Sequence, residues 1–177
     1  MGSFKKSVLI IPSSIIFFLI VPIFTVLFGN RLDSILKLKP LNLGLFRYFL
    51  PVFFLFVGGY YVLESIRILL VKGQGVPLGD VMPDEQSRKL ITTGIYGQTR
   101  NPMLFGYLLC LNAIGILMGS YSTTLLLPVS YLILWTIWLK KVEEPLLEIR
   151  FGEAYRNYKK TTPFLIPRSH KRFFKNT

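Results

Sequence analysis

The chain has 177 residues, 51% of them apolar, and a formal net charge of +12. A soluble domain of this length buries a core without uninterrupted apolar runs of about 20 residues, the length that crosses a bilayer as a helix, so the composition argues against a soluble protein. The charge first suggests nucleic acid, but the cations lie outside the apolar runs, and we expect no nucleic-acid partner.

Four apolar runs define the predicted architecture. In lipid each must be a helix, because no water satisfies exposed backbone groups there. We therefore predict an all-α integral membrane protein with about four transmembrane helices and a cytoplasmic C-terminal amphipathic helical segment. The runs are residues 8–28, 45–70, 103–118 and 121–139.

The first half of the chain, residues 1–70, is predicted to form two of these helices. Gly29 and Asn30 are expected to end the first helix. In the second, Gly58 and Gly59 favour close approach of another helix. Near its end, Glu64 and Arg67 are three residues apart and are expected to pair. An outer loop over residues 31–44 is expected to join the two helices.

The second half, residues 71–177, is predicted to hold a cofactor-binding catalytic core. It begins with a glycine- and proline-rich cytoplasmic loop over residues 72–101, and a loop of that length is usually functional. Gly119 and Ser120 alone join the last two apolar runs, which predicts a tight antiparallel hairpin.

The chain beyond Leu139 becomes amphipathic. Pro145 is expected to bend it and to bias Glu144 away from helical geometry, because proline disfavours the α conformation in the preceding residue. Gly152 is expected to break the helix. Further helical turns are predicted over residues 153–160, followed by a basic tail with aromatic residues that suits anionic lipids at the membrane surface.

The distribution of Lys and Arg predicts the orientation. Sixteen of them precede the first run, lie between the second and third, or follow the fourth, whereas only Arg31, Lys37 and Lys39 lie between the first and second. The positive-inside rule then places both termini in the cytoplasm of a multi-pass protein. With one His and one Cys in the chain, we expect no metal.

Three polar groups on the predicted cytoplasmic side are candidates for chemistry. Gly73 and Gly75 form a Gly-X-Gly turn, which is common on its own. Asn101 and Pro102 are expected to start a helix as N-cap and first residue, leaving the Arg100 side chain free for function. The third group is the adjacent pair Glu143 and Glu144, which opposes the local positive charge and can accept strong hydrogen bonds.

The order of these groups resembles the isoprenylcysteine carboxyl methyltransferase and phospholipid methyltransferase families. The resemblance covers roughly residues 70–168 and includes Thr99-Arg100-Asn101-Pro102-Met103, then Glu143-Glu144-Pro145, Phe151-Gly152-Glu153 and the pair Tyr155 and Tyr158. It implies a membrane methyltransferase that uses S-adenosylmethionine. The implied cofactor-binding residues are Gly73, Gly75, Tyr96, Arg100, Asn101, Pro102, Glu143 and Glu144, with Arg100 and Glu144 as the implied catalytic residues.

The implied methyl acceptor is a lipophilic substrate that enters from the bilayer. Many relatives have His where this chain has Asn101, and Asn cannot act as a base near neutral pH. This mildly favours a carboxylate acceptor of the isoprenylcysteine type, because a carboxylate needs no deprotonation. Relatives often have Tyr at Leu104 and Arg at Gly97. The alternatives are a phospholipid N-methyltransferase, an NADPH-dependent membrane reductase and a non-catalytic membrane scaffold.

Overall fold

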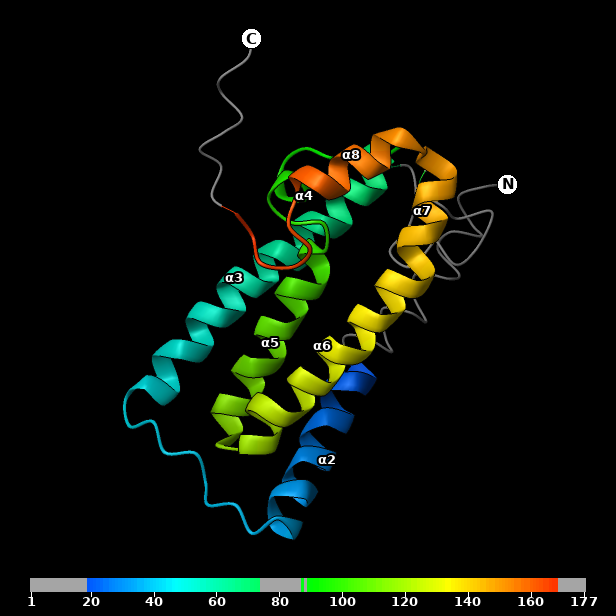
Figure 1. Ribbon diagram of the computed structural model, residues 1–177. Helices are drawn as coiled ribbons and strands as arrows, with labels where there is room; N and C mark the ends of the chain where they lie inside the picture. The colour runs from blue at the N-terminus through cyan, green and yellow to red at the C-terminus, as the bar shows by residue number, and fades with distance from the viewer. Residues whose placement is uncertain (1–18, 74–86, 88, 169–177) are drawn as a thin grey trace, which may run out of the picture. The chain divides into compact units, whose positions relative to one another are not determined.

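The computed structural model describes residues 19–73, 87 and 89–168, and all regular structure within those ranges is helical (Figure 1). The predicted all-α class is thus confirmed for the described part of the chain, whereas residues 8–18 of the first predicted helix lie outside it. The α-helices are α2 (Val21–Ile35), α3 (Phe46–Ile68), α4 (Ile95–Gln98), α5 (Pro102–Met118), α6 (Leu127–Trp138), α7 (Glu144–Phe151) and α8 (Glu153–Thr161). Three π-helical turns extend or join them: η2 (Leu69–Gly73), η4 (Ser122–Leu126) and η5 (Leu139–Glu143).

Two continuous helical stretches are long and apolar enough to cross a membrane by length and composition, Phe46–Gly73 and Ser122–Phe151. The first joins α3 to η2 and the second joins η4, α6, η5 and α7. Helix α5 is apolar but shorter. A stretch of about 20 residues suffices for the hydrocarbon core, so both long helices support a membrane location.

The chain divides into two compact units, and each boundary falls inside a helix. The first unit combines Met1–Tyr60 with Gly106–Lys140, and the second combines Tyr61–Phe105 with Lys141–Thr177. The sequence-based division at residue 70 separates two N-terminal transmembrane helices from a catalytic core, which is a different kind of boundary from that of the compact units. That division stays a prediction.

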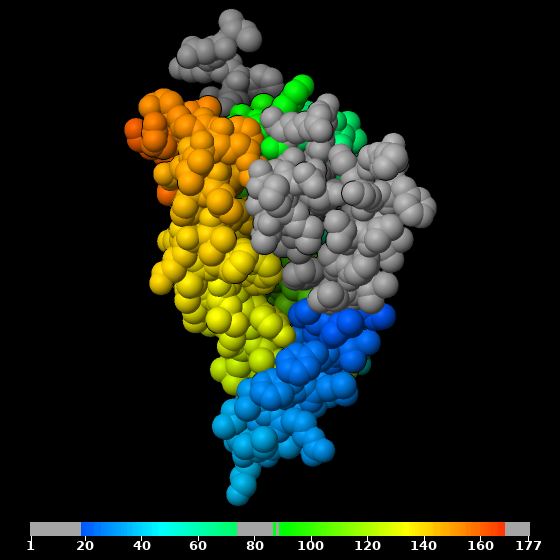
Figure 2. All heavy atoms as spheres, turned by 90° about the vertical axis from the view of Figure 1, so that its right-hand side faces the viewer, coloured from blue at the N-terminus to red at the C-terminus, as the bar shows by residue number. Residues whose placement is uncertain are grey.

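In the first unit, α2 continues beyond the point where the sequence predicts its end. Gly29 and Asn30 lie inside the helix, which runs on to Ile35. Gly29 is buried, and a Cβ atom there would lie 2.0 Å from the Thr123 hydroxyl oxygen. The prediction that Gly29 ends the helix is therefore wrong, because this glycine serves close packing against η4 rather than termination. Figure 2 shows α2, in blue, lying against the yellow-green segment that contains η4 and the start of α6.

A hydrogen-bonded polar pair joins α2 to α6 within this unit. The Thr25 hydroxyl, 1% exposed, lies 3.0 Å from the Tyr131 hydroxyl and donates to the Val21 carbonyl oxygen at 2.6 Å. Small residues and hydroxyl hydrogen bonds are what hold helices together where lipid removes the hydrophobic driving force between them.

The α5–α6 hairpin turns at Gly119, whose φ of +69° suits glycine, so the predicted tight turn is confirmed. At this turn, charged side chains form hydrogen bonds with backbone groups at the end of α5 and at the start of η4. Asp33 Oδ1 accepts from the Ser122 N–H at 2.9 Å, and Arg47 Nη2 donates to the Leu117 carbonyl oxygen at 2.7 Å. The Leu41 N–H adds a bond of 2.7 Å to the Gly119 carbonyl oxygen. Each charge has the sign that the helix dipole favours.

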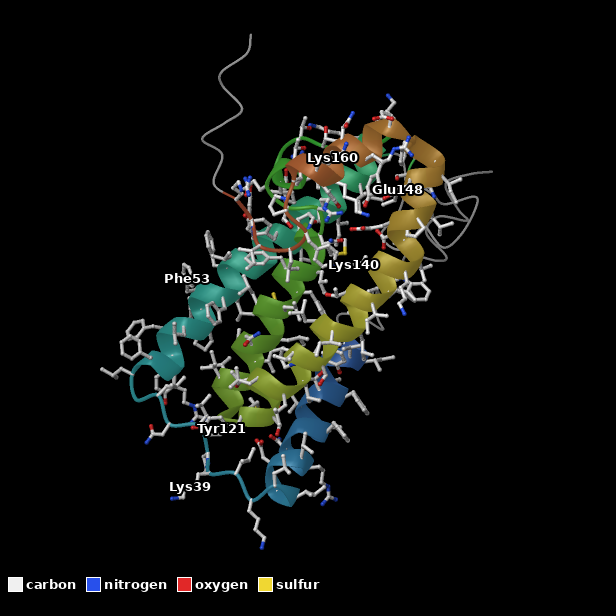
Figure 3. All side chains as sticks on the ribbon, in the orientation of Figure 1. Lys39, Phe53, Tyr121, Lys140, Glu148 and Lys160 are labelled. Atoms are coloured by element: carbon white, nitrogen blue, oxygen red, sulfur yellow. The ribbon has the colours of Figure 1, made fainter. Side chains whose placement is uncertain are left out.

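Only one of the two central glycines of α3 contacts a neighbouring helix. A Cβ atom on Gly58 would lie 2.6 Å from the Gly106 carbonyl oxygen and 2.9 Å from the Cys110 sulfur, whereas one on Gly59 would meet nothing within 4 Å. The expected close approach is thus confirmed for Gly58, whereas Gly59 has no such neighbour among the described residues. The face of α3 that includes Phe53 points away from the other helices (Figure 3).

The prolines do not break the long helix. Pro128 and Pro145 each lie near the start of an α-helix that directly follows a π-turn. Proline lacks an N–H and its ring clashes with the carbonyl four residues before it, and a widened turn upstream removes that conflict. Glu143 is helical (φ −73°, ψ −49°) and α7 begins at Glu144, so the prediction that Glu144 leaves helical geometry is wrong.

In the second unit, Gly152 ends α7 with a φ of +54° and α8 follows directly, as predicted. The expected pair at the end of α3 is present, with Arg67 donating two hydrogen bonds of 2.6 Å to Glu64. The Tyr61 hydroxyl of the same helix donates to Gln98 Oε1 at 2.7 Å. These contacts fix the turn that leads into the candidate site.

Candidate functional site

A clamp of hydrogen bonds joins the turn at residues 98–101 to the segment at residues 162–168, which we call the strap. The buried Thr99 hydroxyl donates to the Leu165 carbonyl oxygen at 2.8 Å, and Asn101 Nδ2 donates to the Phe164 carbonyl oxygen at 2.8 Å. Backbone bonds add to them, from the Arg100 N–H to Pro163 and from the Arg168 N–H to Gln98. Because the bonds use carbonyl and N–H groups of the strap backbone, they fix that backbone rather than particular strap side chains.

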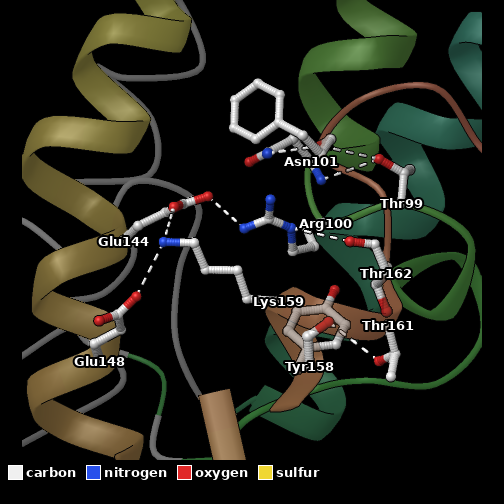
Figure 4. A network of polar contacts seen from close by, with 10 residues as sticks. Thr99, Arg100, Asn101, Glu144, Glu148, Tyr158, Lys159, Thr161 and Thr162 are labelled. Carbon is white, nitrogen blue, oxygen red and sulfur yellow. Dashed lines mark hydrogen bonds and ion pairs between the residues drawn. The ribbon is translucent and has the colours of Figure 1, made fainter. Parts of the chain in front are cut away.

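Arg100 connects the strap to α7. Its Nε donates to the Thr162 carbonyl oxygen at 3.2 Å, its Nη1 is bonded to Glu144 Oε1, and its guanidinium lies 5.5 Å from the Phe164 ring centroid (Figure 4). The Arg100 side chain is only 10% exposed. A buried guanidinium requires partners for its N–H groups, and Arg100 finds them in the strap and in Glu144.

Glu144 is the carboxylate at the centre of the network. Its side chain is 7% exposed, and its second oxygen lies 2.7 Å from Lys159 Nζ. Lys159 also pairs with Glu148 at 3.0 Å, so two cations and two carboxylates balance one another (Figure 4). The hydrogen bonds to Glu144 and Glu148 hold the pKa of Lys159 above its usual value. The strong pairing is what permits a carboxylate to be buried here.

Tyrosines of α8 close one side of this network. Tyr155 and Tyr158 are 3% and 7% exposed, and the Tyr158 hydroxyl donates to the Tyr96 carbonyl oxygen at 2.7 Å. Burial, followed by the charge of Glu144, raises the pKa of Tyr155 to about 12. Burial likewise raises the pKa of Tyr158. Both phenols therefore stay protonated near neutral pH, and Tyr158 donates its hydroxyl hydrogen to Tyr96.

The structure brings four of the eight predicted cofactor residues into this network: Arg100, Asn101 and Glu144 by their side chains, and Tyr96 by its backbone carbonyl oxygen. Pro102 begins α5 as predicted. The charge of Glu143 also reaches Tyr155 and acts to raise its pKa.

Gly73 lies apart from these contacts, at the end of η2, where a Cβ atom would lie 3.2 Å from Ile91. The expected loop geometry is thus wrong for Gly73, which is helical, while Gly75 lies outside the described residues.

The sequence analysis assigned no role to Thr99, Lys159 and Glu148, whose side chains belong to the network. For Lys159 a signal exists, since it follows Tyr155 by four residues and so shares its face of α8. The roles of Thr99 and Glu148 depend on partners 66 and 11 residues away, and spacing does not reveal them.

The network offers acceptors and cations side by side. Carboxylates accept from ligand hydroxyl or ammonium groups, and Arg or Lys pairs with a ligand carboxylate. Among the described residues no group of three or more His, Cys, Asp or Glu side chains is arranged to hold a metal ion. The carboxylates and cations of the network suit an organic ligand that carries hydroxyl groups and a zwitterionic end.

Two comparisons with known proteins bear on this site. Residues 46–154 match the family model described as phospholipid methyltransferase. Over 80 residues the chain is 34% identical to the protein-S-isoprenylcysteine O-methyltransferase of Schizosaccharomyces pombe, a stretch that covers 44% of this chain and 33% of that protein. The chain thus matches about a third of the length of this curated relative. Because the family model spans more than half of the chain, the chain belongs to the phospholipid methyltransferase family.

Proposed function

We propose that this protein is an S-adenosylmethionine-dependent methyltransferase acting on a lipophilic, membrane-embedded substrate. The family match supports the reaction class. The observation that carries the proposal is the buried Arg100–Glu144 ion pair, held beneath the strap and next to Lys159. Burying such charges costs free energy, and clusters of this kind are typical of sites that bind a polar ligand.

The roles of the individual residues follow from their chemistry. S-adenosylmethionine supplies a methyl group activated by its sulfonium. Glu143 and Glu144 accept hydrogen bonds from ribose hydroxyls and from the ammonium of the methionine part. Arg100 positions Glu144 through their ion pair and holds the strap through Thr162. Tyr96, Asn101 and Pro102 shape the backbone around the cofactor, and the family resemblance adds Gly73 and Gly75 to the proposed cofactor-binding residues.

The acceptor that fits best is a carboxylate. Asn101 has no basic nitrogen, and its amide donates to the Phe164 carbonyl oxygen. Without a base at this position, a carboxylate nucleophile, which is already ionised, is favoured over an ammonium. The S. pombe relative is named for O-methylation of isoprenylcysteine. We therefore propose an isoprenylcysteine-type carboxylate, entering sideways from the bilayer.

The membrane arrangement is part of the proposal. Four transmembrane helices, with both termini in the cytoplasm, agree with the asymmetry of Lys and Arg between the loops. This orientation gives the site access to cytosolic cofactor, and the basic tail lies near anionic lipids.

Calorimetric binding of S-adenosylhomocysteine to the detergent-purified chain tests the cofactor. We expect micromolar binding to the wild type and none to the variant Glu143→Gln, Glu144→Gln. The matched control is Glu153→Gln, since Glu153 is 73% exposed and pairs only at the surface with Arg156. Because Glu144→Gln leaves Arg100 without its charged partner, a thermal melt must accompany each titration to establish that the variant is folded.

Other outcomes would assign the protein elsewhere. Binding of NADPH in place of S-adenosylhomocysteine would indicate a reductase, and binding of neither ligand to a folded wild type would favour a scaffold. Given binding, a methylated amine product with no methyl ester would contradict the carboxylate acceptor.

A further inference from the structure

The two cations that share Glu144 differ in how firmly they are held. Arg100 is 10% exposed and is engaged at once by Glu144, the Thr162 carbonyl oxygen and the Phe164 ring. Lys159 is 40% exposed and forms ion pairs with the carboxylates of Glu144 and Glu148. Moving Arg100 would release the strap, whereas moving Lys159 breaks only an ion pair at the edge of the network. Lys159 is therefore the cation that can exchange partners.

Glu148 determines where Lys159 stays if it leaves Glu144. The distance from Lys159 Nζ to Glu148 Oε1 is 3.0 Å, close to the 2.7 Å to Glu144 Oε2. Glu148 is 34% exposed and Glu144 only 7%. A second, more exposed carboxylate thus retains the ammonium next to Glu144 after the inner contact has opened.

We propose that Lys159 recognises the carboxylate of the amino-acid end of the cofactor. In this exchange the ligand's ammonium takes the place of Lys159 on Glu144, and the ligand's carboxylate pairs with the displaced Lys159. This inference rests on the proposed function and assigns to Lys159 a role at the same site.

The exchange conserves the charge balance of the network. A zwitterion brings one positive and one negative group, so each buried or half-buried charge keeps an opposite partner throughout. Leaving Glu144 unpaired would be strongly unfavourable, because a buried carboxylate without a partner bears its full desolvation cost. A ligand with an uncharged end cannot replace Lys159 in this way.

The test compares two ligands that differ only at this end of the molecule. S-adenosylhomocysteine carries the amino-acid end, whereas methylthioadenosine carries the adenosine and the sulfur without it. Binding of each to the full-length, detergent-purified chain is measured by calorimetry for the wild type, Lys159→Met, Lys159→Arg and Lys160→Met. Lys160 is the adjacent exposed lysine of α8 and serves as the matched control (Figure 3).

We expect Lys159→Met to weaken binding of S-adenosylhomocysteine by about tenfold, the contribution of one charge-assisted hydrogen bond. Methylthioadenosine should change by less than about twofold, and its binding also establishes that the site is folded. Lys159→Arg should restore most of the affinity, because it keeps the charge. Lys160→Met should leave both ligands unaffected.

Unchanged binding of S-adenosylhomocysteine to Lys159→Met would overturn the role of Lys159. So would an equal loss for both ligands, which would indicate that Lys159 only supports α8. In both cases the wild type still binds the ligands and the proposed function survives. A wild type that binds neither ligand would instead refute the proposed cofactor, and the role of Lys159 with it.

Discussion

At the scale of single residues, Arg100 organises the candidate site. Its side chain joins the strap backbone at Thr162 to the carboxylate on α7, and it does so from a 10% exposed position. The geometry depends on guanidinium, whose N–H groups point in several fixed directions. A side chain of equal charge and different shape should therefore not form both contacts.

We expect Arg100→Lys to lower the free energy of unfolding by about 1–3 kcal/mol, because an ammonium cannot reach both Thr162 and Glu144 in the guanidinium geometry. Binding of S-adenosylhomocysteine should weaken in parallel. Thermal melts and calorimetry measure the two effects. The control is Arg156→Lys, at a pair whose side chains are 53% and 73% exposed. Equal stability of the Arg100→Lys variant and the wild type would contradict this account.

At the scale of helices, the close contacts depend on individual glycines. Gly58 and Gly59 are neighbours in the same helix, yet a Cβ atom on Gly58 would overlap the Gly106 carbonyl oxygen and the Cys110 sulfur, and one on Gly59 would meet open space. Substituting each of these two glycines in turn therefore separates the effect of helix packing, at Gly58, from the effect of helix propensity, at Gly59.

We expect Gly58→Ala to destabilise the protein by roughly 1–3 kcal/mol through overpacking. Gly59→Ala should be neutral or stabilise it by up to about 1 kcal/mol, since alanine favours helix more than glycine does. Thermal unfolding in one detergent gives both values. The proposed packing of α3 against α5 would be contradicted if Gly59→Ala were the more harmful change.

Asp33 stabilises the hairpin turn by accepting a hydrogen bond from the N–H of the buried Ser122. Burial acts to raise the pKa of Asp33, but hydrogen bonds from Ser120 and Ser122 outweigh it, so the pKa is lowered. Because the pKa of Asp33 is lower in the folded protein than in the unfolded chain, where it is about 3.9, the ionised carboxylate stabilises the fold at pH values above about 3.9. This stabilisation is lost as the pH falls through the pKa of the folded state.

We expect Asp33→Ala to lower stability by about 1 kcal/mol at pH 7, as for the loss of a helix cap. Asp33→Asn keeps an acceptor oxygen and should lose less. Thermal melts at several pH values should show a constant difference between wild type and Asp33→Asn from pH 7 to about 5, shrinking below about pH 4. A difference that grows in acid would refute this assignment.

At the scale of the whole molecule, the proposed topology makes a direct prediction. In a background with Cys110→Ala, which removes the chain's one cysteine, we introduce Lys39→Cys or Lys160→Cys, two exposed positions (Figure 3). A membrane-impermeant maleimide should label Lys39→Cys in intact cells and Lys160→Cys only after permeabilisation. Labelling of both without permeabilisation would contradict the proposed orientation.

The sequence by itself determined the helical class, the approximate positions of the helices after residue 45, the hairpin at Gly119 and the residues of the chemical motifs. The length of apolar runs, glycine geometry and residue chemistry are local properties, so they can be read from a single chain. Asn101, Arg100 and Glu144 were singled out by their residue chemistry together with the family resemblance, and their side chains do lie in one network.

Only the tertiary structure decided how those residues are used. Gly29 lies inside a helix and allows close contact with Thr123, far along the chain, where a side chain would not fit. Glu144 is helical and follows a π-turn. Arg100 is engaged by a strap carbonyl and by Glu144. The outcomes for Gly29 and Arg100 depend on contacts between residues that are distant in the chain. A local sequence pattern does not report the interaction energies of such contacts.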